Sequence, residues 1–162
     1  MLSQGGYRSS PDRPRSGRPS ASSEVTRARM ERQARRDTEP ELAVRRQVWR
    51  LGLRYRVDLA PIRGRRRADL VFTRARVAVY VDGCFWHRCP LHATTPKTNQ
   101  AWWVAKLEAN VERDRDTDAR LHAAGWSVIR VWEHEDPEAA AARIATAVRE
   151  GRAESERGDD RW

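Results

Sequence analysis

The segment VDGCFWHRCPLH gathers a carboxylate, two thiols, two imidazoles and two aromatic rings near the middle of the chain. Its thiols, Cys84 and Cys89, lie five positions apart, and His92 follows them. The chain shows no secretory signal, and cytoplasmic thiols stay reduced, so this spacing favours metal ligands over a disulfide. A structural zinc takes four ligands, but the chain offers five candidates, because His87 and the distant His134 add to these three residues. A site made of Cys84, Cys89, His92 and His134 would tie this segment to residue 134 and leave His87 free for other chemistry, and we predict this set.

Two acidic residues at the ends of neighbouring segments indicate a second metal site. Asp69 begins the run ADLVFT, and Asp82 ends the run VAVYVD. If these runs pair as antiparallel strands, the start of the first lies beside the end of the second. Two carboxylates at one edge of a sheet suit a hard cation such as magnesium. Acids at strand ends also occur in ordinary turns, so this pair needs support from other residues.

That support comes from an expected helix over residues 99–124. Its apolar residues recur at steps of three and four, and Asp114 lies on or beside the stripe they form, with Asn110 one turn earlier. A carboxylate there costs free energy unless it is paired or takes part in chemistry. An ion pair with an arginine is the alternative explanation, and it is the default one for Asp118.

These residues need a scaffold that brings distant segments together. Runs rich in β-branched residues read as strands, and runs with helical spacing of apolar residues read as helices. In chain order they are DTEPELAVRRQVWRLG (helix), RYRVDL, ADLVFT and VAVYVD (strands), residues 99–124 (helix), WSVIRVW (strand) and DPEAAAARIATAVRE (helix). We expect an α/β fold in which a mixed β-sheet is flanked by helices, with a zinc-stabilised loop.

The first helix carries clear boundary signals. Thr38 is the expected N-cap, Pro40 falls in the first turn, and Gly52 ends the helix. Glu41 stands three residues after the cap, which is the position of the acid in a capping box. That structural role is sufficient by itself, so a catalytic role for Glu41 stays open. The expected buried side of this helix consists of Leu42, Val44, Val48, Trp49 and Leu51.

The charge of the chain points to a polyanionic partner. The formal net charge is +9, and residues 45–76 carry eleven arginines against only Asp58 and Asp69. Clustered guanidinium groups gain free energy when they displace counterions from phosphates, so nucleic acid is the first candidate. Coding bias is the alternative, since Lys97 and Lys106 are the only lysines. Bias explains the choice of arginine over lysine but not the clustering.

The chain length of 162 residues predicts a single domain. Residues 1–23 are rich in Ser, Gly, Pro and Arg and read as a disordered basic leader. The folded domain is expected over residues 24–150, beginning with a marginal helix or arm over 24–36, and residues 151–162 are expected to form a flexible tail. No apolar run approaches membrane-spanning length. We expect a cytoplasmic, nucleoid-associated protein.

Three segments together resemble a known family: RRDTEPELAVRRQVWRLGLRYRV, ADLVFTRARVAVYVDGCFWHRCPLH and KTNQAWWVAKLEANVERDRDTDARLHAAGWSVIRVWEHE. They are similar to the very short patch repair (Vsr) endonucleases over roughly residues 24–149, and the motifs GCFWH and NVERD are specific to that family. The resemblance implies a restriction-endonuclease-like core that uses magnesium and is stabilised by zinc. It also implies nicking of double-stranded DNA on the 5′ side of the thymine in a T:G mismatch.

The same resemblance assigns roles to the acidic residues and to His87. Asp69 matches the primary magnesium ligand, helped by the main-chain carbonyl of Val81. Glu41, His87 and Asp114 match positions that hold water at the metal or assist proton transfer. Asp82 stands where the usual family pattern has a histidine, so its carboxylate is expected to bind the metal directly.

Aromatic residues complete the implied site. Phe85, Trp86 and Trp103 match family residues that wedge into the base stack beside the mismatch, and Asn110 is a further expected DNA contact. Unstacking costs a few kcal/mol per step and is cheapest at a mispair, so such wedges favour the damaged site. Burial in a protein core is the alternative role for Phe85 and Trp86.

Two other functions remain open at this point. One is a site-specific restriction enzyme or another DNA-nicking nuclease of the same fold. The other is a catalytically silent, zinc-stabilised DNA-binding module, although Glu41, Asp69, His87 and Asp114 together argue against silence. A nick in one strand needs one active site, so we expect a monomer.

Overall fold

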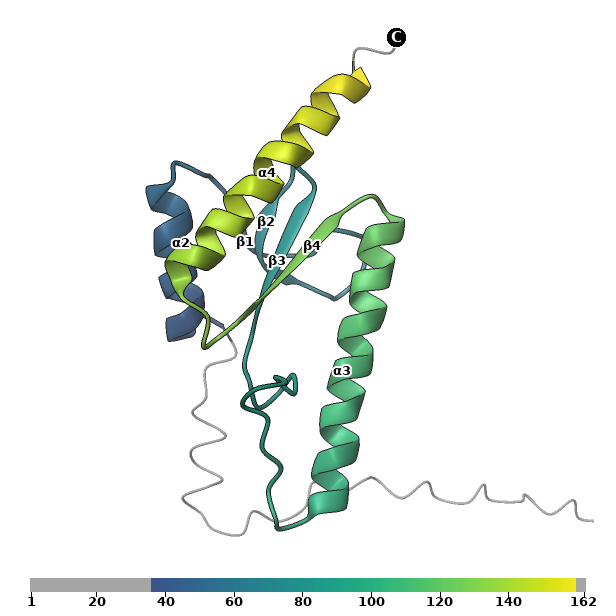
Figure 1. The fold of residues 1–162 in the computed structure, drawn as a ribbon. Helices are drawn as coiled ribbons and strands as arrows, with labels where there is room; N and C mark the ends of the chain where they lie inside the picture. The colour runs from purple at the N-terminus through teal and green to yellow at the C-terminus, as the bar shows by residue number, and fades with distance from the viewer. Residues whose placement is uncertain (1–35, 160–162) are drawn as a thin grey trace, which may run out of the picture.

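A computed structural model describes residues 36–159, which form a sheet with helices on both faces (Figure 1). The elements are α2 (Glu39–Arg50), β1 (Arg56–Leu59), β2 (Ala68–Phe72), β3 (Val77–Asp82), α3 (Gln100–Ala123), β4 (Ser127–Trp132) and α4 (Pro137–Asp159). This architecture confirms the expected α/β fold and the order of its elements. The expected leader over 1–23 and the arm up to residue 35 lie outside the described residues.

The four strands lie in the order β1-β2-β3-β4. β2 pairs antiparallel with both β1 and β3, and the second pairing is the one considered for the runs ADLVFT and VAVYVD. β4 pairs parallel with β3, and the connection between them contains α3. Parallel pairing aligns the ends of β3 and β4, so that Asp82 lies opposite Trp132. The segments that follow these two strands therefore leave the sheet side by side.

The helices divide between the two faces of the sheet. α2 and α4 cover one face, and α3 lies on the other (Figure 1). The larger core joins Val44 and Val48 of α2 to Ile144 and Val148 of α4 over the inner residues of the sheet. On the opposite face, Leu121 of α3 packs with residues of β2 and β3 in a smaller cluster.

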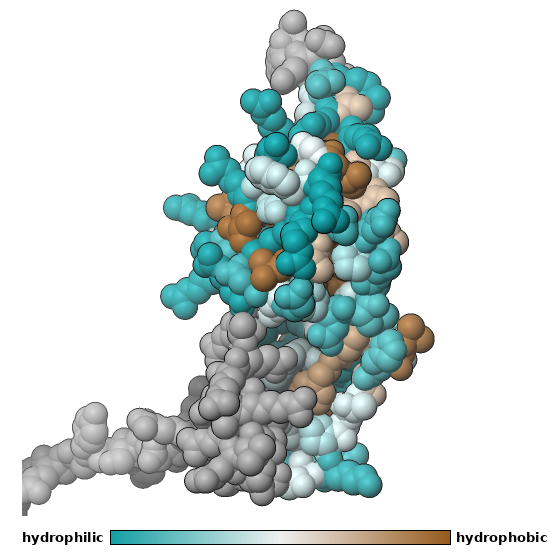
Figure 2. Space-filling model, turned by 90° about the vertical axis from the view of Figure 1, so that its left-hand side faces the viewer, coloured by the Kyte–Doolittle hydropathy of each residue, from teal (hydrophilic) through white to brown (hydrophobic). Residues whose placement is uncertain are grey.

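The buried side of α2 differs from the expectation at its end. Val44 and Val48 are buried as expected, but Trp49 is 56% exposed and Leu51 is 48% exposed. The buried stripe instead runs through Glu41 and Arg45 at steps of three and four residues. Trp49 supports the guanidinium of Arg54, whose central carbon lies 3.7 Å from the ring centroid. The face on the α2 side is largely hydrophilic, with scattered apolar groups (Figure 2).

α4 continues past the expected end at Glu150 to Asp159. At Gly151 the helix approaches the turn between β2 and β3 so closely that a Cβ would overlap the carbonyl oxygen of Ala75. Farther along, the Ser155 hydroxyl donates a 3.0 Å hydrogen bond to the Arg74 carbonyl. These contacts explain why the expected tail is helical up to that residue. Within residues 36–159, no helix has the length and apolar character needed to cross a bilayer.

Candidate active site and metal centre

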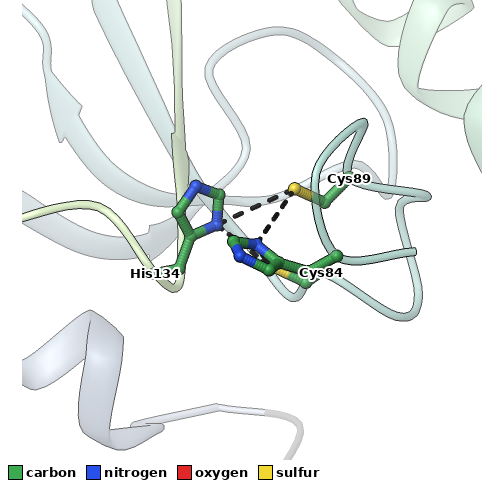
Figure 3. A group of neighbouring side chains, drawn as sticks. Cys84, Cys89 and His134 are labelled. Carbon is green, nitrogen blue, oxygen red and sulfur yellow. Dashed lines mark hydrogen bonds between the residues drawn. The ribbon is translucent and has the colours of Figure 1, made fainter. Parts of the chain in front are cut away.

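The four predicted zinc ligands come together after the ends of β3 and β4. Cys84, Cys89, His92 and His134 place one ligand atom each within 4.8 Å of all the others. Figure 3 shows the labelled side chains of Cys84, Cys89 and His134 turned toward one another. Both cysteines are buried, whereas the two histidines are exposed. The parallel pairing of β3 and β4 makes this possible, because it brings residue 134 beside the segment that begins at Gly83.

The spacing of these atoms fits a tetrahedral cation. The Cys84 Sγ lies 3.0 Å from His134 Nδ1 and 3.9 Å from His92 Nδ1, and the Cys89 Sγ lies 3.8 Å from each of the same two nitrogens. A tetrahedral zinc with ordinary bond lengths separates its ligand atoms by roughly 3.3–3.8 Å. The Glu133 carboxylate accepts a 2.7 Å hydrogen bond from the Cys84 amide and fixes that end of the loop. The cluster can therefore hold a metal ion after small adjustments of these side chains.

A second group of side chains occupies the end of the sheet where β2 begins and β3 ends. The Asp69 carboxylate accepts a 2.7 Å hydrogen bond from the Val81 amide, as antiparallel pairing predicts. Burial raises the pKa of Asp69 to about 6; the Val81 hydrogen bond opposes this shift, and the charges of Glu41 and Asp82 add to it. The three carboxylates thus share one region of negative potential, which favours a cation.

Glu41 has the structural role that the sequence predicted for it at the start of α2. It is buried, and its Oε2 accepts a 2.9 Å hydrogen bond from the Asp37 amide, just before the helix begins. The same oxygen accepts a 3.1 Å hydrogen bond from Arg45. Thr38 is the N-cap residue by position, but its side chain makes no capping hydrogen bond. Glu41 therefore secures the start of α2 and also directs its charge toward Asp69.

Arg130 is the main residue of this site that sequence reasoning missed. Its guanidinium donates to Asp82 at 2.7 Å and to both oxygens of Asp118 at 3.0 and 2.9 Å. It also lies 3.6 Å from the Asp114 carboxylate, and these acids raise the pKa of Arg130 above its usual value. The available signal was one arginine inside the apolar run WSVIRVW, opposite a helix that carries acids four residues apart. The expected ion pair for Asp118 is confirmed.

Asp82 is almost fully buried, with 4% of its surface exposed. One carboxylate oxygen accepts the Arg130 hydrogen bond, and the other lies 3.7 Å from the His87 Nδ1. Burial raises the pKa of Asp82, although the His87 and Arg130 charges oppose that shift. A buried carboxylate with this partner is anchored within the protein, which limits its freedom to turn toward a cation.

His87 and Asp114 form the shortest contact of the site, 2.5 Å between Nδ1 and Oδ2. Burial alone disfavours the imidazolium, but the Asp114 hydrogen bond and the Asp82 charge outweigh it and raise the pKa of His87. The expected placement of Asp114 on the inner side of α3 is thus explained by a partner on the loop after β3. With Nδ1 engaged, Nε2 is the nitrogen left for proton transfer to another group.

The aromatic residues form a cluster beside this pair. The ring of Phe85 lies 5.0 Å from that of Trp86 and 5.5 Å from that of Trp103, between centroids. Phe85 and Trp86 are half-buried, whereas Trp103 is only 9% exposed and supports them from α3. Asn110, also buried, donates a 3.2 Å hydrogen bond to the Trp86 carbonyl. Asn110 and Trp103 thus position the loop, while Phe85 and Trp86 are partly accessible.

The arginine-rich region does not face solvent throughout. Arg45 is buried and bonds to Asp37 and Glu41. Arg67 pairs with Asp58 of β1. Others, among them Arg63, are exposed on the loop that joins β1 to β2. Part of the clustering therefore has a structural cause, and the rest leaves a basic surface near the acids.

Clustered acids and an imidazole at one end of the sheet can hold a cation and move a proton, which are the two tasks of phosphodiester cleavage. Residues 21–92 match the family described as DNA mismatch endonuclease Vsr. The type II nicking enzyme V.NaeI of Lentzea aerocolonigenes is 45% identical over 122 residues, which are 74% of this chain and 74% of that protein. The type II nicking enzyme V.NmeDIP of Neisseria meningitidis serogroup C is 38% identical over 70% of this chain and 78% of its own length. The DNA mismatch endonuclease Vsr of Escherichia coli strain K12 is 39% identical over 62% of this chain and 64% of its own.

The chain belongs to the DNA mismatch endonuclease Vsr family. It is a DNA endonuclease with a restriction-endonuclease-like core, which confirms the resemblance drawn from the sequence motifs.

Proposed function

We propose that this endonuclease nicks one strand of double-stranded DNA on the 5′ side of the thymine in a T:G mismatch and so initiates very short patch repair. The observation that supports this most directly is the aromatic cluster next to the His87–Asp114 pair. Phe85 and Trp86 are partly accessible, and the Trp103 ring on α3 packs against the Phe85 ring. Aromatic side chains at such a place can enter a weakened base stack while the adjacent groups reach the backbone.

We further propose magnesium as the catalytic cation, held by the Asp69 carboxylate and the Val81 main-chain carbonyl. When bound, magnesium would supply positive charge at the scissile phosphate and activate a water molecule for attack. The raised pKa of Asp69, about 6, fits this role, since a carboxylate among other negative charges gains most from a cation. Glu41 adds to the negative potential and orients water.

We propose that Asp82 serves the same site without the direct metal contact that was expected from the sequence. Its carboxylate is already bonded to Arg130, and a direct metal contact would need to break or share that bond. We therefore place Asp82 beside the magnesium ligands, where it fixes Arg130 and adds negative potential. His87, oriented by Asp114 and with a raised pKa, holds the proton that is passed to the leaving 3′ oxygen.

Zinc is the proposed ion of the cluster formed by Cys84, Cys89, His92 and His134. Two thiolates and two imidazoles are a common structural zinc set, and all four positions are filled by protein groups. No open position remains for a substrate, so the role is structural. The ion would fix the loop that carries Phe85, Trp86 and His87 against the end of β4.

The test is to separate cutting from binding with Asp69→Asn. This variant is expected to lose nicking of a T:G duplex while it binds that duplex nearly as well, because the basic surface and the aromatic cluster are unchanged. Asp58→Asn, at a carboxylate of β1 that pairs with Arg36 and Arg67, is the matched control and should keep its activity. Full nicking by Asp69→Asn would remove Asp69 from the mechanism.

Two other functions give different results in the same assay. A site-specific nuclease would cut a matched duplex at its recognition sequence as well as a mismatched one. A silent DNA-binding module would bind DNA and cut neither duplex at any magnesium concentration.

A further inference from the structure

A cavity of about 180 Å³ lies between the loop that joins β1 to β2 and the second half of α3. None of its lining residues belongs to the predicted catalytic or zinc-binding sets. Its polar lining consists of Arg63, Arg65, Arg66, Tyr80, Thr117 and Arg120. Four of these residues are arginines, and they come from two elements, the β1–β2 loop and α3.

The cavity carries an excess of positive charge. Asp116 binds two of the four arginines, with contacts of 2.5 Å to Arg66 and 3.0 Å to Arg120. Arg63 and Arg65 have no ion-pair partner within residues 36–159. One carboxylate therefore faces four guanidinium groups, which leaves two of them available for an anion. Arg66 also donates a 2.9 Å hydrogen bond to Thr117, so the loop is tied to α3.

The hydroxyl of Tyr80 supplies a second, independent observation. It is buried in the protein, and it finds no hydrogen-bond partner within the described part of the chain. A buried polar group without a partner is costly, and most such groups are paired. A tyrosine hydroxyl is a hydrogen-bond donor at neutral pH. With a small movement of the lining side chains, an acceptor inside the cavity would satisfy this donor.

The position of Tyr80 relates the cavity to the acids at the end of the sheet. Tyr80 stands two residues before Asp82 on β3, on the same face of the strand. Two residues of a strand span roughly 6.6 Å, a distance comparable with the step from one backbone phosphate to the next. If the scissile phosphate lies at Asp69, a neighbouring phosphate of the same strand would lie toward the cavity.

We propose that this cavity is a second phosphate site, which binds a backbone phosphate of the DNA strand near the one that is cut. Arg63 and Arg65 supply charge to the phosphate oxygens, and Tyr80 donates a hydrogen bond to one of them. This inference rests on the proposed DNA substrate. It adds a contact that positions the strand and takes no part in the cleavage step.

The test begins with Tyr80→Phe, which removes only the hydroxyl and keeps the ring that lies beneath the Arg130 guanidinium. The free protein should be as stable as the parent or more stable, because an unsatisfied buried donor is gone. Its affinity for a T:G duplex should fall about tenfold, the effect of losing one hydrogen bond to a charged group. A purely structural hydroxyl would give the opposite pattern, with stability lost and affinity retained.

The second measurement is the salt dependence of duplex binding by Arg63→Ala/Arg65→Ala. Losing one phosphate contact should reduce the slope of log K against log salt by about 0.9. The matched control is Arg74→Ala/Arg149→Ala, which removes the same charge from exposed positions at the other end of the sheet. The control should change the slope less.

Duplexes with a single uncharged methylphosphonate identify the phosphate itself. At one backbone position, this change should weaken binding by the parent protein more than binding by Tyr80→Phe, which keeps only the arginine contacts to that phosphate. Affinity of Tyr80→Phe equal to that of the parent, with equal salt slopes for the two double variants, would overturn the proposal. So would a Tyr80-dependent stabilisation by inorganic phosphate without any effect on DNA. These failures would leave mismatch nicking by the parent protein intact, whereas failure of the proposed function would remove that activity itself.

Discussion

Asp69→Asn should stabilise the magnesium-free protein at neutral pH. The folded state raises the pKa of Asp69 from 3.8 to about 6, so it binds the proton more tightly than the unfolded chain does. The stabilisation from that proton is fully present below the unfolded pKa and is lost as pH rises through the folded pKa. At pH 7.5 the ionised carboxylate therefore destabilises the fold, and a neutral amide of the same shape does not.

The size of the effect follows from the shift. About two pKa units at 1.36 kcal/mol each give roughly 3 kcal/mol as an upper value at pH 7.5. At pH 5, where Asp69 is mostly protonated in the folded protein, the advantage of Asp69→Asn should fall to about half. Asn keeps an oxygen that can accept the Val81 hydrogen bond, so the comparison isolates the charge.

Urea unfolding at both pH values, with zinc retained and magnesium absent, measures this difference. Asp58→Asn is the control. The Asp58 carboxylate pairs with two arginines, so removing its charge should destabilise the fold. Added magnesium should stabilise the parent and not Asp69→Asn, since a ligand that binds only the folded state adds to its stability. The reasoning is refuted if Asp69→Asn is less stable than the parent at pH 7.5, or if its advantage does not change with pH.

Arg130→Met should lower the free energy of unfolding by about 3–5 kcal/mol, because Asp82 would be buried without its partner. Adding Asp82→Asn should restore much of that free energy, as measured by urea unfolding. Equal stability of the single and double variants would contradict the pairing. Trp86→Ala should weaken binding to a T:G duplex more than to a matched one, by on the order of 1–3 kcal/mol in titrations, if its ring stacks on a base. A large fall in melting temperature with unchanged mismatch preference would instead make Trp86 a core residue. The parent protein should contain about one zinc ion per chain, and Cys84→Ser should lose both this ion and thermal stability. Full metal content in Cys84→Ser would show that Cys84 is not a ligand.

The sequence predicted those parts of the site whose chemistry allows few alternatives. Two closely spaced thiols followed by a histidine indicated metal binding, and the chosen set of four candidate ligands, which includes the distant His134, comes together in the structure. The start of β2 and the end of β3 met as antiparallel pairing requires, which placed Asp69 beside Val81. Both inferences depend on local spacing and on one strand pairing.

The features of the fold and site that the sequence did not predict depend on contacts between distant elements. Arg130 lies in a run that reads as a continuous buried strand, and its partners are on α3 and β3. Trp49 was expected to be buried because it is apolar, but α2 is oriented so that Glu41 and Arg45 face inward and Trp49 faces solvent. The length of α4 depends on its contact with the β2–β3 turn. No pattern within residues 151–159 indicates that contact.

The most direct test of the proposed function is to map the cut on duplexes that differ by one base. A duplex with a central T:G pair, labelled on each strand in turn, is compared with the matched T:A and C:G duplexes in the same flanking sequence, with magnesium present. We predict a single nick on the 5′ side of the mismatched thymine, no cut in the strand that carries the guanine, and little cutting of either matched duplex. Equal cutting of the matched duplexes, or cleavage of both strands, would contradict mismatch-directed nicking and favour a site-specific nuclease.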